Sequence, residues 1–295
     1  MKPILFTGAA TAIITPFDEK GVDYASFGKL IDWQIEQGID AIVVAGTTGE
    51  ASTLTDEEHK KVIKYCVDRA AGAVPVIAGT GSNDTDYAIG LTQYADKAGA
   101  DGMLLVTPYY NKATQNGLYE SFKAVADSTD KPIVLYNVPS RTGCNILPQT
   151  AKRLSEIKNI VAIKEACGNL SQIAQTAALC RDELTLYSGN DDQITPVLSL
   201  GGKGVISVLS NAMPKETSKL VHDYLEGRIA EAAKAQLDLL PFINALFCEV
   251  NPIPVKAAMA AMGYCKNMLR LPLTPMEKDS EAKMLAVMKE LGLVS

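Results

Sequence analysis

Eight short apolar runs, rich in β-branched residues, recur along the first two thirds of the 295-residue chain and constrain its fold more than any other feature. They are residues 11–17, 39–45, 74–80, 101–107, 132–138, 160–166, 184–189 and 204–209. Most are apolar at consecutive positions, as in parallel strands buried on both faces. Their starts lie 20 to 35 residues apart, which leaves room for one crossover helix in each gap. The pattern therefore predicts eight βα units.

Helix signals fill the gaps between these runs. Thr55 and Glu58 form a capping box that opens a helix running toward Ala71, and Gly99 ends a helix that begins after Asp84 or Thr85. The repeated order of strand, loop, helix and glycine predicts an α/β fold, a closed (β/α)8 TIM barrel. An open doubly wound sheet is the alternative, but no GxGxxG motif follows the first run.

The strand signal stops beyond about residue 214, and helices are predicted from there on. The predicted helices cover residues 215–225, 229–247, 254–262 and 275–291. We therefore predict a catalytic barrel over residues 1–225 and an α-helical C-terminal extension over residues 226–295. The apolar start, residues 1–6, is interpreted as a strand of the fold rather than as a targeting segment.

Composition excludes several functional classes. The formal net charge is -6 and no dense lysine and arginine cluster occurs, so neither nucleic acid nor an anionic membrane is expected as a partner. No run reaches the roughly 18–20 apolar residues of a transmembrane helix. Six cysteines without a CxxC pair indicate a reducing compartment, so a cytoplasmic location is expected. His59 and His222 lie outside metal-binding motifs, so no metal site is expected.

Lys164 is the most informative polar residue, because three apolar residues carry it to the C-terminal end of the sixth predicted strand. In (β/α)8 barrels the active site lies at these strand ends. An apolar barrel mouth favours the neutral amine, the nucleophile that forms a Schiff base with a carbonyl substrate. The alternative is a lysine that reaches water or pairs with Glu165, although strand alternation places Glu165 on the opposite face.

Further polar residues follow the neighbouring strands. Tyr136 lies one strand earlier at a similar depth, where a phenol can relay protons; the alternative is a core tyrosine with a satisfied hydroxyl. Arg141 follows in the same loop region and suits bidentate binding of a carboxylate, although many loop arginines are only solvated. The GTTG turn at residues 46–49 offers N–H groups and hydroxyls to a small anion. Together these residues predict chemistry on a small keto acid.

Six motifs, in this order, resemble the 4-hydroxy-tetrahydrodipicolinate synthase (dihydrodipicolinate synthase) family. They are GTTGE at 46–50, PYYN at 108–111, YNVPSRT at 136–142, IKE at 163–165, SGND at 188–191 and NPIPVK at 251–256. The resemblance spans nearly the whole chain. It implies a Schiff-base-forming lyase of diaminopimelate and L-lysine biosynthesis that condenses pyruvate with L-aspartate 4-semialdehyde to 4-hydroxy-tetrahydrodipicolinate. It implies no metal or organic cofactor.

The resemblance also implies catalytic roles for four residues. Lys164 would form the imine with C2 of pyruvate, and Tyr136, Thr47 and Tyr110 would move protons. Family members are usually homotetramers, dimers of dimers, in which Tyr110 would reach into the neighbouring subunit's site. A binding protein that merely retains the fold is disfavoured, because all four residues are present.

Substrate-binding roles follow from the same resemblance. Thr47 and Thr48 would bind the pyruvate carboxylate, Arg141 would bind the semialdehyde carboxylate, and Gly189 and Ile206 would line the pocket. The alternatives are N-acetylneuraminate lyase and keto-deoxy-sugar-acid aldolases, which use the same lysine imine. The paired threonines and Arg141 favour the synthase, because sialic-acid lyases tend to have Ser-Thr in this turn and to lack the arginine.

Many bacterial relatives are inhibited by L-lysine at an allosteric pocket. By the resemblance, this pocket maps to Ala51, Asp56, His59, Asn83, Tyr87 and Tyr109. Inhibited enzymes often carry histidine at the Asp56 position and glutamate at the Tyr87 position. Without that glutamate the ammonium group of lysine lacks a charged partner. Weak or absent feedback inhibition is therefore predicted.

Overall fold

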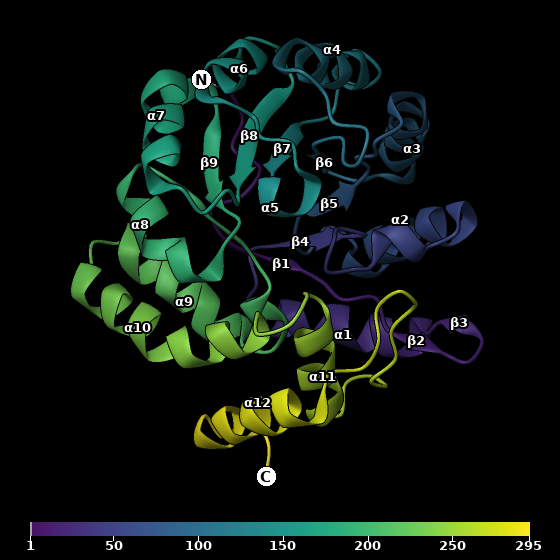
Figure 1. Ribbon diagram of the computed structural model, residues 1–295, viewed down its shortest axis with the longest axis vertical. Helices are drawn as coiled ribbons and strands as arrows, with labels where there is room; N and C mark the ends of the chain where they lie inside the picture. Colours follow the sequence, from purple (N-terminus) through teal and green to yellow (C-terminus); the bar gives the residue numbers. More distant parts are fainter. Residues whose placement is uncertain (1) are drawn as a thin grey trace.

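The computed structural model describes residues 2–295, in which eight parallel strands form a closed barrel (Figure 1). The strands are β1 (Gly8–Ala12), β4 (Ala41–Val44), β5 (Val76–Gly79), β6 (Gly102–Val106), β7 (Ile133–Asn137), β8 (Ile160–Glu165), β9 (Thr185–Ser188) and β10 (Gly204–Ser207). Consecutive barrel strands pair with one another, and β10 closes the barrel onto β1. The predicted (β/α)8 barrel is therefore confirmed, and the open sheet is excluded.

Helices surround the barrel, each following a barrel strand along the chain (Figure 1). They are α1 (Tyr24–Glu36), α2 (Asp56–Ala70), α3 (Thr85–Ala98), α4 (Gln115–Ala126), α6 (Pro148–Ser155), α7 (Leu170–Cys180), α8 (Ile194–Ser199) and α9 (Pro214–Leu225). The predicted capping box of α2 is present, since Thr55 and Glu58 bond each other's backbone N–H groups. A short helix, α5 (Pro139–Thr142), follows β7 where a loop is predicted.

The first strand lies earlier than its prediction. β1 covers Gly8–Ala12 instead of residues 11–17, residues 2–6 form no strand, and Met1 lies outside the described residues. Glycine and alanine have low intrinsic strand propensity, so the pattern favours the isoleucines that follow. Barrel closure overrides this preference, because Ala10 pairs with both Ile206 and Ala41. The chain then forms an unpredicted hairpin of β2 (Phe17–Asp18) and β3 (Gly21–Val22).

Two apolar cores explain why the strands are apolar at consecutive positions. Ala10, Val43 and Leu104 belong to a cluster inside the barrel, whereas Ile42 and Leu105 pack against the surrounding helices. Successive residues of a strand point to opposite faces. Both faces are therefore buried, and a polar side chain on a strand must find a partner or border a cavity.

Three further helices follow the barrel: α10 (Ile229–Leu246), α11 (Ile253–Ala261) and α12 (Lys278–Glu290). α10 packs against α9 and α12, and α11 contacts the short helix η4 (Leu209–Asn211) beyond β10. The predicted C-terminal helical extension is confirmed, while its boundary at residues 225 and 226 stays a prediction. Among the described residues, no helix combines the length and apolar character needed to span a membrane.

Candidate active site

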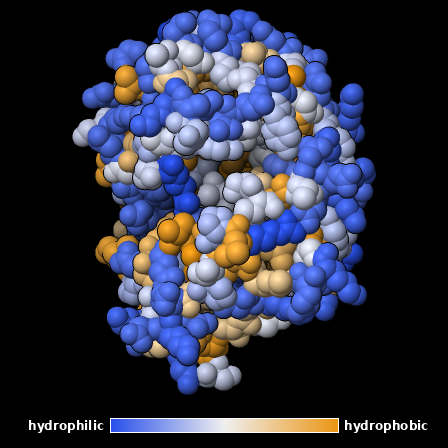
Figure 2. All heavy atoms as spheres, turned by 45° about the vertical axis from the view of Figure 1, so that its right-hand side comes forward, coloured by the Kyte–Doolittle hydropathy of each residue, from blue (hydrophilic) through white to orange (hydrophobic). Residues whose placement is uncertain are grey.

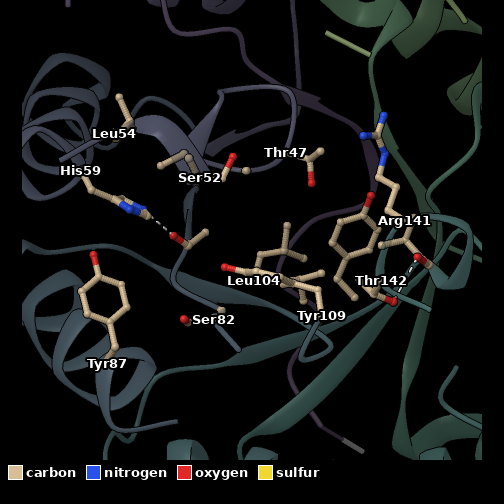
Figure 3. Close-up of a pocket in the computed structure, with 18 residues that line it drawn as sticks. Thr47, Ser52, Leu54, His59, Ser82, Tyr87, Leu104, Tyr109, Arg141 and Thr142 are labelled. Atoms are coloured by element: carbon tan, nitrogen blue, oxygen red, sulfur yellow. Dashed lines mark hydrogen bonds between the residues drawn. The ribbon is translucent and has the colours of Figure 1, made fainter. Parts of the chain in front are cut away.

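A cavity of about 370 Å³ opens at the carboxyl ends of β4 to β7, and Figure 2 shows a hollow on this side of the molecule. Figure 3 shows Thr47 and Arg141 toward one end of the cavity and His59 and Tyr87 toward the other. Tyr136 also lines it. The cavity thus lies at the face where (β/α)8 barrels assemble their active sites.

Lys164 lies on β8 with its side chain inside the barrel. It pairs in register with Tyr136 on β7 and Tyr187 on β9, both members of the inner cluster, and it is only 5% exposed. Its Nζ lies 4.2 Å from the centre of the Tyr136 ring. None of the ion pairs within residues 2–295 includes Lys164. A buried amine without a carboxylate partner is suited to act as a nucleophile.

Glu165 points away from Lys164, to the outer face of the barrel. Its carboxylate accepts hydrogen bonds from Asn137 Nδ2 (3.0 Å) and from the Cys167 backbone N–H (3.0 Å). Burial raises the pKa of Glu165, and these hydrogen bonds oppose the rise. The alternative that Lys164 pairs with Glu165 is therefore wrong, because strand alternation separates them.

Gly189 follows β9 and leaves room for Lys164. A Cβ at this position would lie 3.1 Å from Lys164 Cε and 2.7 Å from Ala166 Cβ. Any side chain would therefore displace the lysine or its neighbour. Ile206 lies on β10 inside the barrel, in register with Ala10, and is fully buried. Gly189 thus contacts the Lys164 region directly, whereas Ile206 contributes apolar packing within the barrel.

The turn that carries Thr47 and Thr48 has an unusual backbone. Ala45 and Glu50, which flank residues 46–49, both have left-handed φ values, 53° and 54°. Such values are costly for residues other than glycine and need support from the surrounding structure. Hydrogen bonds from Gly49 N and Ala51 N to Gly46 O (3.1 and 3.3 Å) close the turn.

The two threonines of this turn have different surroundings. Thr47 lines the cavity, whereas Thr48 is buried and its Oγ1 accepts a hydrogen bond from Asn251 Nδ2 (3.0 Å). Arg141 lines the cavity and donates from Nη2 to the backbone carbonyl of Asn251 (3.0 Å). Asn251 therefore links the threonine turn to the arginine, and Arg141 keeps other N–H groups for an anion.

Tyr110 is the predicted catalytic residue that the structure places apart from the others. It is 91% exposed, has a left-handed φ of 69° and does not line the cavity, whereas the adjacent Tyr109 does. Within one chain, therefore, Thr47 and Tyr136 share the cavity while Tyr110 faces outward.

Only some of the predicted allosteric residues line the cavity. Ala51, His59, Tyr87 and Tyr109 line the cavity, but Asp56 and Asn83 do not. His59 Nε2 bonds the Gly79 carbonyl oxygen at 2.9 Å, and burial lowers the pKa of His59. Asp56 pairs with Lys60 at 2.7 Å, and this hydrogen bond lowers the pKa of Asp56.

The sequence predicted no role for Asn251 or Lys256, although both lie in the NPIPVK motif at 251–256. Lys256 is a fully buried lysine on an otherwise apolar helix, and it forms an ion pair with Glu50. A lysine in an apolar helix itself indicates a buried ion pair, since buried charges are paired.

In the part of the chain that the structure describes, no group of three or more His, Cys, Asp or Glu residues could hold a metal ion.

The fold and the cavity together define a class of protein. A (β/α)8 barrel carries a buried lysine beside a tyrosine, next to a cavity at the carboxyl ends of the strands. This arrangement is that of a barrel enzyme that forms a Schiff base with a carbonyl substrate.

Comparisons with known proteins define the particular family. The family model of the dihydrodipicolinate synthetase family matches residues 5–291. The 4-hydroxy-tetrahydrodipicolinate synthase of Acetivibrio thermocellus is 56% identical over 294 residues, covering 100% of both chains, and that of Caldicellulosiruptor saccharolyticus is 57% identical over 279 residues, covering 94% of each. A crystal structure of dihydrodipicolinate synthase from Thermotoga maritima has a TM-score of 0.97 at 44% identity, covering 99% of this chain and 100% of that one. The chain belongs to the dihydrodipicolinate synthetase family, and the predicted resemblance is confirmed.

Proposed function

We propose that the chain condenses pyruvate with L-aspartate 4-semialdehyde to 4-hydroxy-tetrahydrodipicolinate, in diaminopimelate and L-lysine biosynthesis. The observation that carries this proposal is Lys164, buried without a carboxylate partner and with its Nζ 4.2 Å from the Tyr136 ring centre. The family match and the names of its relatives support the choice of substrates.

The proposed reaction begins at Lys164. Its Nζ adds to C2 of pyruvate, and water leaves as the imine forms. Loss of a proton from C3 gives an enamine, whose C3 bonds the aldehyde carbon of the semialdehyde. The amine of that substrate then attacks C2 and closes the ring, and the bond between C2 and Nζ breaks to free Lys164. The reaction overall releases one water and needs no oxidant, reductant or cofactor.

Tyr136 and Thr47 would move the protons of these steps, because Tyr136 lies beside Lys164 and Tyr136 and Thr47 line the cavity. We propose that Tyr110 completes the relay in the cavity of a neighbouring subunit. Its 91% exposure supports this assignment. The proposed assembly is therefore a homo-oligomer, a tetramer built as a dimer of dimers.

Substrate carboxylates would be bound at the threonine turn and at Arg141. Thr47 and Thr48, with the N–H groups of their turn, would hold the pyruvate carboxylate, and Arg141 would hold that of the semialdehyde. Gly189 and Ile206 would shape the pocket around the imine. We also propose a cytoplasmic location, which the six free cysteines support.

We further propose that L-lysine inhibits this chain weakly or not at all. Tyr87 supplies a phenol at the cavity, and Asp56 is paired with Lys60 instead of lining the cavity. A lysine ammonium at this end would thus lack a dedicated carboxylate. An inhibition curve with L-lysine tests the proposal, and strong inhibition at physiological concentrations would contradict it.

The decisive experiment measures pyruvate consumption with three acceptors: L-aspartate 4-semialdehyde, N-acetylmannosamine and glyceraldehyde. Turnover confined to the semialdehyde, and absent in Lys164→Ala, is expected. Turnover only with the sugars would assign the chain to the N-acetylneuraminate lyase or keto-deoxy-sugar-acid aldolase alternative. Turnover that survives in Lys164→Ala would show that another residue is the nucleophile.

A further inference from the structure

Glu50 and Lys256 form a buried ion pair between the threonine turn and the C-terminal extension. Their side chains are 1% and 0% exposed, and Lys256 Nζ contacts Glu50 Oε1 although 206 positions separate them in sequence. Lys256 Nζ also lies 4.1 Å from the centre of the Phe17 ring. Burial lowers the pKa of Lys256, and the Glu50 charge opposes this shift. An unpaired charge at this depth costs folding free energy, so each side chain of the pair holds the other in position.

A second residue of the extension holds the same segment. The backbone N–H of Arg270 donates to Glu50 Oε2 (3.1 Å), and its guanidinium donates to the Thr53 carbonyl oxygen (2.8 Å) and to Glu58 Oε2 (2.6 Å). Glu58 is also the N3 residue of the α2 capping box, in which it bonds the Thr55 N–H. Residues 50–58, which follow the threonine turn, are therefore held in place by Lys256 and Arg270 of the C-terminal extension.

The turn needs such support because of its backbone. Ala45 and Glu50 both have left-handed φ values, and the backbone N–H and carbonyl groups of the turn bond only to residues 46–53 and to the Thr15 hydroxyl. Ala45 is held on one side, since its carbonyl oxygen packs so closely on Gly79 that a Cβ there would lie 2.2 Å away. On the other side, the Glu50 carboxylate is held by Lys256 and Arg270.

We propose that Lys256 and Glu50 are a positioning pair, through which the C-terminal extension sets where Thr47 and Thr48 lie in the active site. The extension would thus act on catalysis although Lys256 touches no proposed reacting atom. Asn251, on the same extension, bonds Thr48 directly and Arg141 through its carbonyl oxygen. The proposal rests on the proposed function insofar as the threonines bind pyruvate.

The test uses a double variant, Glu50→Gln with Lys256→Met, which removes both charges and leaves neither one unpaired. It is assayed in the full chain beside Glu50→Asp, which keeps the charge but shortens the side chain. Three quantities are measured: the melting temperature, kcat and KM for pyruvate, and the pyruvate concentration that half-saturates borohydride trapping on Lys164. Lys266→Met, which breaks the exposed ion pair of the same extension with Glu19, is the matched control.

Both Glu50 variants are expected to fold, and their kcat/KM for pyruvate to fall about tenfold or more, because small displacements of binding groups have large effects. Trapping at saturating pyruvate should still reach completion, since β8 holds Lys164 independently of the turn. The Lys266 variant should match the parent. Folded variants whose kcat and KM stay within about twofold of the parent would overturn the proposal. If the double variant fails to fold, Glu50→Asp decides by the same criterion, and unfolding of both would assign the pair to stability and overturn a positioning role.

Failure of the proposed function has a different signature. A parent chain that traps pyruvate but does not consume it with the semialdehyde would refute the synthase activity. The trapping curves need no acceptor, so they still compare the variants. A raised half-saturating pyruvate concentration in the Glu50 variants would then support the positioning pair, and an unchanged one would overturn it.

Discussion

Strands β7 and β8 carry two adjacent polar pairs, Tyr136 with Lys164 and Asn137 with Glu165, which lie on opposite faces of the barrel. Tyr136 of the inner pair lines the cavity, and Lys164 takes part in none of the ion pairs within residues 2–295. The outer pair is buried, with Asn137 Nδ2 donating to Glu165 (3.0 Å) and Asn137 Oδ1 accepting from Ile146 N (2.9 Å). Polar residues on one strand thus contribute either to the active site or to the stability of the fold. Those that contribute to stability have their polar atoms paired with other protein groups.

The largest effect is expected for Lys164→Ala. If the inner pair supplies the nucleophile, turnover should fall about 10³-fold or more, and no pyruvate adduct should be trapped by borohydride. Mass spectrometry of the reduced protein measures the adduct. Lys158→Ala, in the turn that precedes the same strand, is the control and should keep full activity. A trapped adduct in the Lys164 variant would contradict the assignment.

Tyr136→Phe should lower kcat about 10²-fold, because it removes a proton-transfer group while keeping the ring beside Lys164. Tyr187→Phe is the matched control, since Tyr187 neighbours Lys164 in register but its hydroxyl donates to the Phe6 carbonyl oxygen (2.6 Å). That control should cost about 1 kcal/mol of stability and retain kcat. Equal losses of kcat in the two variants would remove the special role of Tyr136.

On the outer face, Asn137→Ala should affect stability more than activity. The variant leaves the Ile146 N–H without a buried partner and removes the Asn137 donor from Glu165, which keeps only the Cys167 N–H; this should cost about 1–3 kcal/mol of unfolding free energy. Denaturant unfolding measures this cost, and steady-state assays at a temperature where the variant is folded measure kcat. A large loss of kcat with unchanged stability would show that both faces serve catalysis.

The smallest expected effect is a pH dependence of stability that Glu165 contributes. Its pKa in the folded chain is raised above the ordinary value of 4.5 by burial. The folded state therefore holds this proton more tightly, and the corresponding stability is present below pH 4.5 and lost as the pH rises through the folded pKa. The difference in unfolding free energy between the parent and Glu165→Gln should follow this course. A difference that does not change with pH would contradict it.

Local pattern predicted the repeating units because each unit is short and buries both strand faces. It also placed Lys164 and Tyr136 at one depth, since alternation and strand position depend on few neighbours. The pattern failed for β1, where small residues form a strand only because the barrel closes around them. It also gave no sign that α5 follows β7.

The sequence by itself determined the barrel, its helical extension and the lysine at the end of β8. Only the tertiary structure decided that Thr47 faces the cavity while Thr48 bonds Asn251, and that Lys256 holds Glu50. These contacts join residues 203 and 206 positions apart. Strand and helix patterns arise from interactions within a few residues, whereas contacts of this separation exist only after the chain has folded.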